Sequence, residues 1–321
     1  MAAAVRATAV CIVCSSIVLV GCGGGGGGGF PTARLMVFRD WQTAPDNNDD
    51  IALYDIQQQQ IIVLPGLNSP SREGSPSISG DGRYIVFDSE RPHDPGGATD
   101  REILLYDREM GALVGLTGIN SAQADQDPDI SPEGRYIGFE SGRVGWDIWL
   151  YNRETLGYVP TPNLNSGSVD ADPALSNDAG LIAFESNRPE SLGGYDVFLY
   201  DRNADQMVTL PGLNSTANDQ EPDISADGHY IVFQSDRLSG LGGWDVWVYD
   251  VWLQQLLSLT AMNSTDDDEA PGISRDGRYI AFQSDRAGTS EDVHLWDREA
   301  QRFVDVSPAN SPDAEQDPKL N

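Results

Sequence analysis

The sequence predicts an all-β protein, a six-bladed β-propeller of four-stranded antiparallel blades. Five related segments, beginning at Pro76, Pro128, Pro173, Pro222 and Pro271, align without gaps. An Asn-Ser pair and an acidic residue ahead of a further apolar run each occur six times, at constant distances from a proline. The chain begins with one part of a repeat and ends with the missing part. The C-terminal strand is therefore expected to join the N-terminal blade and close the ring.

Each repeat is expected to contain four short strands, A to D. Strand A follows the proline, as in residues 76–79, and an Asp-Gly turn separates it from strand B, as in 84–87. Strand C begins at the acidic residue, as in 102–107, and strand D is a weaker apolar run, as in 61–64. Strands B and C are apolar on both faces, so each blade must pack between two neighbours. A repeat of about 50 residues suits a propeller blade.

The chain divides into a leader, a tether and the propeller. Residues 1–21 have the pattern of a secretory signal, with Arg6 ahead of an apolar run. The run ends in Leu-Val-Gly before Cys22, which is similar to a bacterial lipoprotein signal and predicts acylation of Cys22; a simple cleaved signal is the alternative. Residues 22–32 would form a glycine-rich tether and residues 33–321 the propeller. All three cysteines lie in the first 22 residues, so the propeller has no disulfide.

The net charge limits the classes of partner that this protein can bind. It has 50 acidic and 20 basic residues and a net charge of −30. Nucleic acid is excluded as a partner, because contacts with phosphates need clustered lysine and arginine. We expect a monomeric propeller whose contact with a membrane is made through the lipid anchor alone.

The acidic residues gather on one predicted face. Loop length varies only between strands B and C, and these B–C loops share a face with the Asn-Ser loops that lead into strand A. Three residues before each proline stands a carboxylate: Glu73, Asp125, Asp170, Asp219, Asp268 and Glu315. The same loops carry seven further acids: Asp127, Asp172, Glu221, Asp266, Asp267, Glu269 and Asp317. Together they are candidates for an acidic channel mouth that binds a basic partner segment. The alternative for the six recurring acids is that they accept backbone hydrogen bonds within the fold.

Roles can also be predicted for several other polar and aromatic residues. The arginines that end the S-x-R segments are expected to pair with the strand-C acids or the turn aspartates; they are Arg91, Arg143, Arg188, Arg237 and Arg286. The runs 46–50 and 266–269 offer oxygen ligands for Ca²⁺, but neither has EF-hand spacing, and a solvated charge run is the alternative. Metal binding is therefore left open. Four aromatic residues are candidates to line the binding face: Trp41, Trp146, Tyr195 and Trp244.

The repeat pattern resembles that of the TolB-type propeller family, a six-bladed fold of the bacterial periplasm. The segments that carry the resemblance are P-x-I-S-x-D-G-R-Y-I-x-F-x-S-x-R and D-I-W-L-Y-D, and they extend over residues 33–321. Periplasmic TolB has an α/β domain before its propeller that docks an inner-membrane partner. Here a tether leads directly into the first blade, so the resemblance implies the fold and not a role in the Tol–Pal machinery.

No catalytic motif accompanies the repeats. The sequence has no G-x-S-x-G, H-E-x-x-H or phosphate-binding loop, and its three histidines occupy three different repeat positions. We therefore expect a non-enzymatic lipoprotein of the cell envelope that needs no cofactor and binds a protein or peptide partner at its acidic, loop-rich face. The residue after the cysteine is Gly23, as is typical of lipoproteins that are sorted to the outer membrane. This resemblance implies that the propeller lies in the periplasm or at the cell surface. Two alternatives remain open: a carbohydrate-active hydrolase or lyase, and a glycan- or solute-binding propeller, assisted by Ca²⁺ or not.

Overall fold

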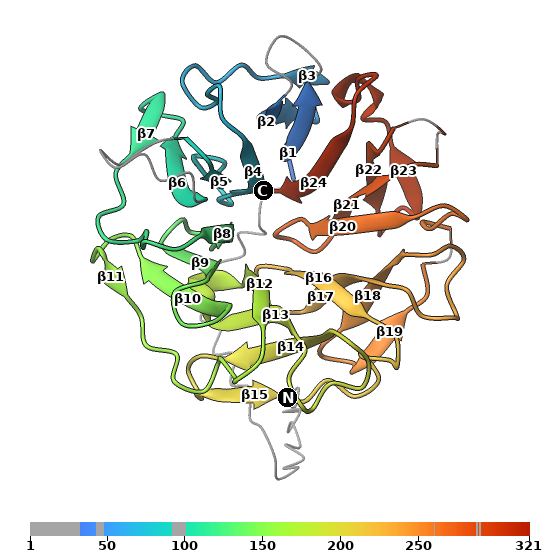
Figure 1. Cartoon of the computed structure of the whole chain (residues 1–321). Helices are drawn as coiled ribbons and strands as arrows, with labels where there is room; N and C mark the ends of the chain where they lie inside the picture. Colours follow the sequence, from blue (N-terminus) through green and yellow to red (C-terminus); the bar gives the residue numbers. More distant parts are fainter. Residues whose placement is uncertain (1–32, 43–47, 92–100, 260, 287, 289) are drawn as a thin grey trace, which may run out of the picture.

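Six four-stranded antiparallel sheets surround a central axis in chain order (Figure 1). This computed structural model describes residues 33–42, 48–91, 101–259, 261–286, 288 and 290–321. The predicted signal peptide, Cys22 and the tether lie outside the described residues. Within the described ranges, the only helices are two 3-10 turns, η1 (Asn177–Ala179) and η2 (Ser307–Ala309), and no helix is long and apolar enough to cross a membrane.

The strands follow the predicted A-to-D order in each blade. Blades 1 to 3 consist of β24 (Glu315–Leu320), β1 (Leu35–Gln42), β2 (Asn48–Asp55) and β3 (Gln60–Ile61); β4 (Glu73–Ile78), β5 (Tyr84–Ser89), β6 (Glu102–Asp107) and β7 (Ala112–Val114); and β8 (Asp125–Ile130), β9 (Tyr136–Ser141), β10 (Asp147–Asn152) and β11 (Gly157–Tyr158). Blades 4 to 6 consist of β12 (Asp170–Leu175), β13 (Leu181–Ser186), β14 (Asp196–Asp201) and β15 (Gln206–Val208); β16 (Asp219–Ile224), β17 (Tyr230–Ser235), β18 (Asp245–Asp250) and β19 (Gln255–Leu257); and β20 (Asp268–Ile273), β21 (Tyr279–Ser284), β22 (Asp292–Asp297) and β23 (Arg302–Val304).

The ring is closed by the predicted strand exchange. β24 pairs antiparallel with β1, with Leu320 opposite Met36. The side-chain oxygen of Asn321 accepts hydrogen bonds from the backbone N–H groups of Arg34 and Leu35, at 2.9 and 2.8 Å. The first blade therefore contains both ends of the propeller, and in Figure 1 β24 lies beside β1 with the C-terminus near the axis. The prediction of six blades closed by the C-terminal strand is confirmed.

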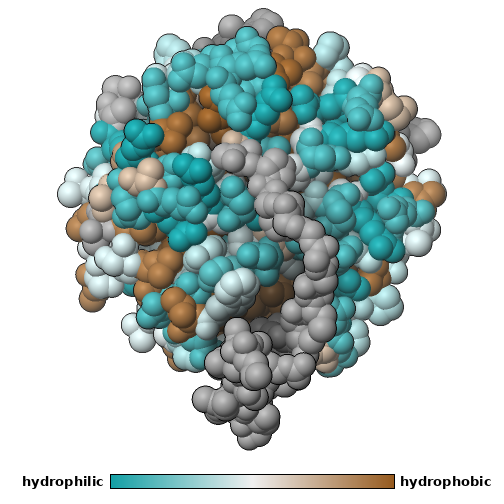
Figure 2. Space-filling model, turned by 180° about the vertical axis from the view of Figure 1, so that it is seen from behind, coloured by the Kyte–Doolittle hydropathy of each residue, from teal (hydrophilic) through white to brown (hydrophobic). Residues whose placement is uncertain are grey.

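The hydrophobic core lies between blades rather than within any one of them. Every blade places a fully buried phenylalanine from strand B and a large aromatic residue from strand C into these interfaces. The six phenylalanines are Phe38, Phe87, Phe139, Phe184, Phe233 and Phe282, and their strand-C partners are Tyr54, Tyr106, Tyr151, Tyr200, Tyr249 and Trp296. The apolar character of both faces of strands B and C follows from this packing. The face seen in Figure 2 is mainly hydrophilic, with hydrophobic residues in separate groups.

The recurring arginines and acids form buried clusters inside blades 2 to 6, and here the predicted pairing is wrong. Arg188 does not bind the strand-C acid Asp196. It contacts Asp170, the recurring acid that begins strand A, at 2.6 Å, and donates to the carbonyl of Leu164 at 2.9 Å and to the hydroxyl of Ser186 at 3.2 Å. Strand A also begins three residues earlier than predicted, so the recurring acids lie within it. The same ion pair joins Arg91 to Glu73, Arg143 to Asp125, Arg237 to Asp219 and Arg286 to Asp268.

These clusters should contribute strongly to stability. Asp170 is fully buried, so Asp170→Ala leaves the buried guanidinium of Arg188 without its counter-ion. We expect the free energy of unfolding to fall by about 3–5 kcal/mol, measured by urea denaturation followed by tryptophan fluorescence. Glu154→Ala is the control, because Glu154 pairs with Arg135 at the surface and its loss should cost less than about 1 kcal/mol. Equal losses in the two variants would contradict a structural role for the buried clusters.

Candidate functional site

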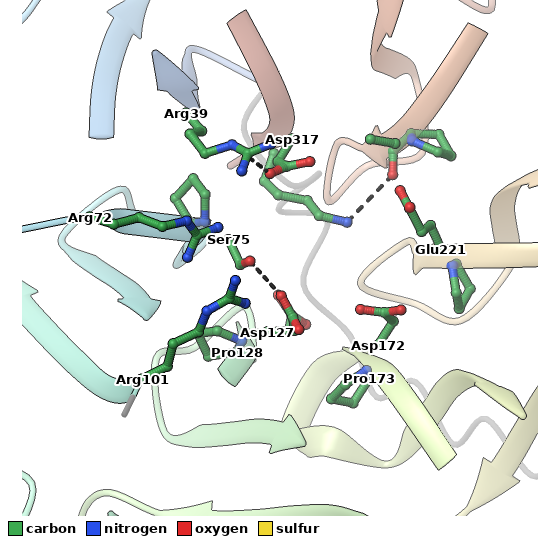
Figure 3. Close-up of a pocket in the computed structure, with 16 residues that line it drawn as sticks. Arg39, Arg72, Ser75, Arg101, Asp127, Pro128, Asp172, Pro173, Glu221 and Asp317 are labelled. Atoms are coloured by element: carbon green, nitrogen blue, oxygen red, sulfur yellow. Dashed lines mark hydrogen bonds and ion pairs between the residues drawn. The ribbon is translucent and has the colours of Figure 1, made fainter. Parts of the chain in front are cut away.

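A polar cavity of about 230 Å³ lies on the propeller axis at the end where the strands A begin (Figure 3). Each blade contributes the residue that precedes its strand-A proline, and these six residues form a ring: Ser75, Asp127, Asp172, Glu221, Ala270 and Asp317. Arg39, Arg72 and Arg101 line one side of the cavity, whereas Asp172 and Glu221 face it from the other side (Figure 3). The walls of the cavity therefore differ in charge.

A repeated backbone bulge places these side chains at the axis. All six ring residues have positive φ angles, between 46° and 51°, and the pairing of strand A with strand B shifts register at this point in every blade. Positive φ is unusual for residues other than glycine, and a bulge redirects the side chain out of the ladder. The bulge is thus a property of the fold, while the chemistry of the ring depends on which residue occupies it.

The bulge is held by the residue that follows the strand-B phenylalanine in the preceding blade. Glu185 accepts a hydrogen bond from the backbone N–H of Glu221 at 3.0 Å. In the same way, Gln234 accepts from Ala270 at 2.8 Å and Gln283 from Asp317 at 3.0 Å. Glutamine therefore meets this structural requirement as well as glutamate does. Ser75 and Ala270 likewise show that the bulge itself does not need an acid.

Five acids of blades 3 to 5 form what we call the carboxylate wall. Asp127, Asp172 and Glu221 line the cavity, and Glu140 and Glu185 lie behind them, near enough to interact with their charges. Within the part of the chain that the structure describes, no arginine, lysine or histidine lies within 4.0 Å of these carboxylates. Asp127 accepts from the hydroxyl of Ser75, and Glu140 and Glu185 each accept from a glutamine side chain. These five carboxylates therefore crowd together without a neutralising cation.

Burial and mutual repulsion raise the pKa values of this wall. Burial, then the charge of Asp127, raises the pKa of Glu140 to about 9. Burial, then the charges of Asp317 and Glu185, raises the pKa of Glu221 to about 8, although Lys319 opposes the shift. The pKa of Asp172 is also raised well above its ordinary value, by burial and then by Glu185 and Asp127. A cation placed here would relieve this repulsion.

The arginine wall differs because its charges are already paired. Arg72 contacts Asp88 at 2.9 Å and Asp49 at 3.1 Å. Arg39 contacts Asp317 at 3.2 Å as well as Asp49. An anion approaching this side would compete with carboxylates that already occupy the guanidinium groups. The cavity as a whole is therefore suited to a cation rather than to an anion.

The deeper part of the channel is crossed by a buried arginine. Arg275 reaches from blade 6 to the carbonyls of Ile78 in blade 2 and Ile130 in blade 3, at 2.7 and 3.1 Å. Above it, Lys319, the only lysine in the chain, lies 3.8 Å from the carboxylate of Asp223. A ligand of the cavity would therefore enter from the loop face.

The thirteen predicted mouth residues separate into three groups. The six recurring acids begin strand A, are fully buried, and accept hydrogen bonds inside the blades, which agrees with the alternative stated for them. Four further acids line the cavity: Asp127, Asp172, Glu221 and Asp317. Asp266 and Asp267 are exposed on the loop before β20, and Glu269 is half-buried. In the described residues, no group of three His, Cys, Asp or Glu side chains is placed to hold a metal ion.

Several residues of the site were not predicted from the sequence. Glu140 and Glu185 follow the strand-B phenylalanines, where a polar residue inside an apolar strand was the available signal. The cavity-lining arginines Arg39, Arg72 and Arg101 lie outside the recurring S-x-R position and gave no pattern. Of the predicted aromatic residues, the side chain of Trp41 lies outside the described residues.

Comparison with known proteins identifies the fold. No protein-family model and no curated protein matches the chain. TolB from Acinetobacter baumannii is similar in structure over 91% of this chain and 67% of its own, with a TM-score of 0.65 and 18% identity. The fold is that of a TolB-like propeller. A TolB structure from Agrobacterium tumefaciens aligns over 86% and 89% of the two chains, with a TM-score of 0.58 and 19% identity. An oligogalacturonate lyase from Vibrio parahaemolyticus aligns over 77% and 71%, with a TM-score of 0.53 and 13% identity.

The raised pKa values of the wall predict an unusual dependence of stability on pH. Glu140 and Glu221 ionise near pH 4.5 in the unfolded chain but only near pH 9 and 8 in the folded protein. Between these limits the folded protein binds more protons than the unfolded chain, so their contribution to stability is lost as pH rises. Glu140→Gln and Glu221→Gln should therefore raise the melting temperature by a few degrees at about pH 9 and much less at about pH 5.

The measurement is the thermal unfolding midpoint of each variant across this pH range. Exposed Glu154→Gln provides a control with the same change of charge. If all three variants change the midpoint equally at both ends of the pH range, the carboxylates of the wall do not repel one another as described.

Proposed function

We propose that this protein is a non-enzymatic binding module that holds a protein or peptide partner at its loop-rich face, with a lysine or arginine of the partner inserted in the axial cavity. The supporting observation is the carboxylate wall: five buried or half-buried acids from three adjacent blades, with no cation within ion-pair distance among the described residues. A cationic side chain at ion-pair distance would offset the mutual repulsion of these acids, which Lys319 only partly opposes.

The repeat supplies an internal comparison in favour of this proposal. The backbone contact that Glu185 makes in blade 4 is made by glutamine, Gln234 or Gln283, in the next two blades. The ring position held by Asp172 and Glu221 is held by Ser75 and Ala270 in two other blades. The fold thus tolerates uncharged residues at both positions. The acids of blades 3 to 5 therefore add a charge that the architecture does not require.

The arrangement gives less support to catalysis. The cavity acids occupy equivalent positions in successive blades, rather than forming an acid–base pair in one blade. His229 and His294 do not line the cavity, and His93 lies outside the described residues. The likeness to an oligogalacturonate lyase is a likeness of fold at 13% identity, and the lyase alternative carries no further support from the site.

The proposed cellular setting is the bacterial envelope, with the propeller anchored through an acylated Cys22 in the outer membrane. This setting derives from the signal-like sequence of residues 1–22, and the TolB-like fold is consistent with it. Radiolabelled palmitate in cells producing the full chain, compared with Cys22→Ser, tests the anchor directly.

Binding can be tested with a random peptide library displayed on phage and panned against the purified protein. Selected peptides should be rich in lysine or arginine. As synthetic peptides, they should bind the Asp172→Asn/Glu221→Gln protein about tenfold or more weakly by calorimetry, because an ion pair in a desolvated site is lost.

Asp266→Asn/Asp267→Asn is the matched control, since it likewise replaces two carboxyl groups by amides, at exposed positions of the same face. Equal weakening by both double variants would mean that only the overall charge attracts peptides. Peptides without a basic residue that bind both double variants unchanged would overturn the role of the cavity.

A further inference from the structure

One position at the end of the B–C loops makes the same contact in five blades: the residue before the strand-C acid. Its backbone carbonyl accepts the N–H of the acid that begins strand A in the next blade. This bond joins Trp146 to Asp170, Tyr195 to Asp219 and Trp244 to Asp268, at 3.0, 2.8 and 2.9 Å. Arg101 and Glu291 make the same bond in blades 2 and 6. Of these residues, Arg101 lines the cavity itself, and the others occupy the equivalent backbone position of their own blades.

Only the blades that carry the carboxylate wall have an aromatic residue at this position: Trp146, Tyr195 and Trp244, here called the aromatic rim. The same blades contribute Asp127, Asp172 and Glu221 to the cavity. Tyr195 shows how close the two layers are. Burial, followed by the charges of Glu185, Glu140 and Asp172, raises the pKa of its hydroxyl.

Exposed aliphatic residues extend this aromatic rim outward. Trp146 is 38% exposed, and the same B–C loops expose four aliphatic side chains. Together they define an apolar rim: Val144, Trp146, Leu192, Leu238 and Leu241. The B–C loops of the other blades include the segments 43–47, 92–100 and 287–291, whose sequences contain no leucine, valine, isoleucine or large aromatic residue.

The loops that carry these leucines are held in place by the fold. Buried Asp196 accepts the N–H of Leu192 at 2.6 Å, and buried Asp245 accepts the N–H of Leu241 at 2.8 Å. Gly193 and Gly242 pass so close to the next loop that a Cβ would lie 1.8 and 2.4 Å from a backbone oxygen. The loop structure thus needs the aspartates and glycines, whereas the leucines between them face solvent. Exposed apolar residues on preformed loops are typical of interaction surfaces.

We propose that blades 3 to 5 dock an extended protein segment in which apolar residues flank a lysine or arginine, so that the apolar side chains cover the apolar rim while the cation enters the cavity. The inference rests on the proposed function and specifies the partner. Charge complementarity selects this occupant, because the cavity residues of the same three blades are acids with no cation at ion-pair distance among the described residues, which disfavours an acidic partner. The aromatic rim residues can also stack on the cation as it passes.

The test uses the same phage-selected peptides and the purified protein. Leu192→Ser/Leu238→Ser/Leu241→Ser removes exposed side chains and should leave folding intact, as checked by the melting temperature. We expect it to weaken binding of the selected peptides about tenfold. Val63→Ser/Met110→Ser/Leu253→Ser, which changes exposed apolar residues after β3 and in two C–D turns, should have no effect. The selected sequences should place an aliphatic or aromatic residue beside the basic one.

The two proposals can fail separately. If the leucine variant binds the peptides as the unchanged protein does while the Asp172→Asn/Glu221→Gln protein does not, the docking surface is wrong and the cavity proposal stands. If binding depends on the leucines alone, the apolar rim binds a neutral partner. Both the proposed cation in the cavity and the proposed partner segment are then contradicted. If sedimentation shows a dimer that the leucine variant abolishes, the rim is covered by a second copy of this chain, and the inference is overturned.

Discussion

The geometry of the whole molecule depends on six strands that converge on one axis. Each strand A must approach five copies of itself, and the bulge before its proline turns one side chain from every blade into a shared ring. Such a ring concentrates whatever charge its residues carry, because it holds the carboxylates around one partly enclosed cavity, where screening is weaker than on an open surface. The raised pKa values of Glu221 and Asp172 follow directly from this convergence.

Comparison of equivalent positions in the six blades also distinguishes residues that the fold requires from residues that can vary. The ion pair between Arg188 and Asp170 recurs in four other blades, and it joins the first residue of strand A to the segment that follows strand B. Its members are buried and satisfied, so they have no capacity left for a ligand. Residues that change from blade to blade under the same backbone constraints, such as Glu185 and Gln234, are free of that requirement. In a fold whose blades repeat the same backbone, a function confined to some blades has to depend on such variable positions.

The sequence predicted the architecture well because constant spacing reports backbone geometry directly. The blade number, the ring closure and the loop-rich face all followed from it. The arginine pairing did not, because Ser141 lies opposite both Asp125 and Asp147 in the sheet, and a linear pattern cannot decide toward which neighbour Arg143 turns. Three of the five acids of the carboxylate wall were predicted from the sequence. Asp127, Asp172 and Glu221 were identified as additional acids, whereas Glu140 was missed because a strand apolar on both faces has no alternation to reveal an axial position.

Two levels of electrostatics would act on the basic partner proposed above. The net charge of −30 produces a long-range field that accelerates encounter and is screened by salt over about 10 Å. The carboxylate wall acts only after contact, in a cavity crossed by Arg275 at its deeper end, where screening is weak. The field therefore governs the rate of association, and the cavity governs dissociation. Because the wall retains protons that a bound cation would displace, occupation of the cavity is coupled to proton release, and the affinity for the cation must rise with pH over the range in which Glu140 and Glu221 ionise.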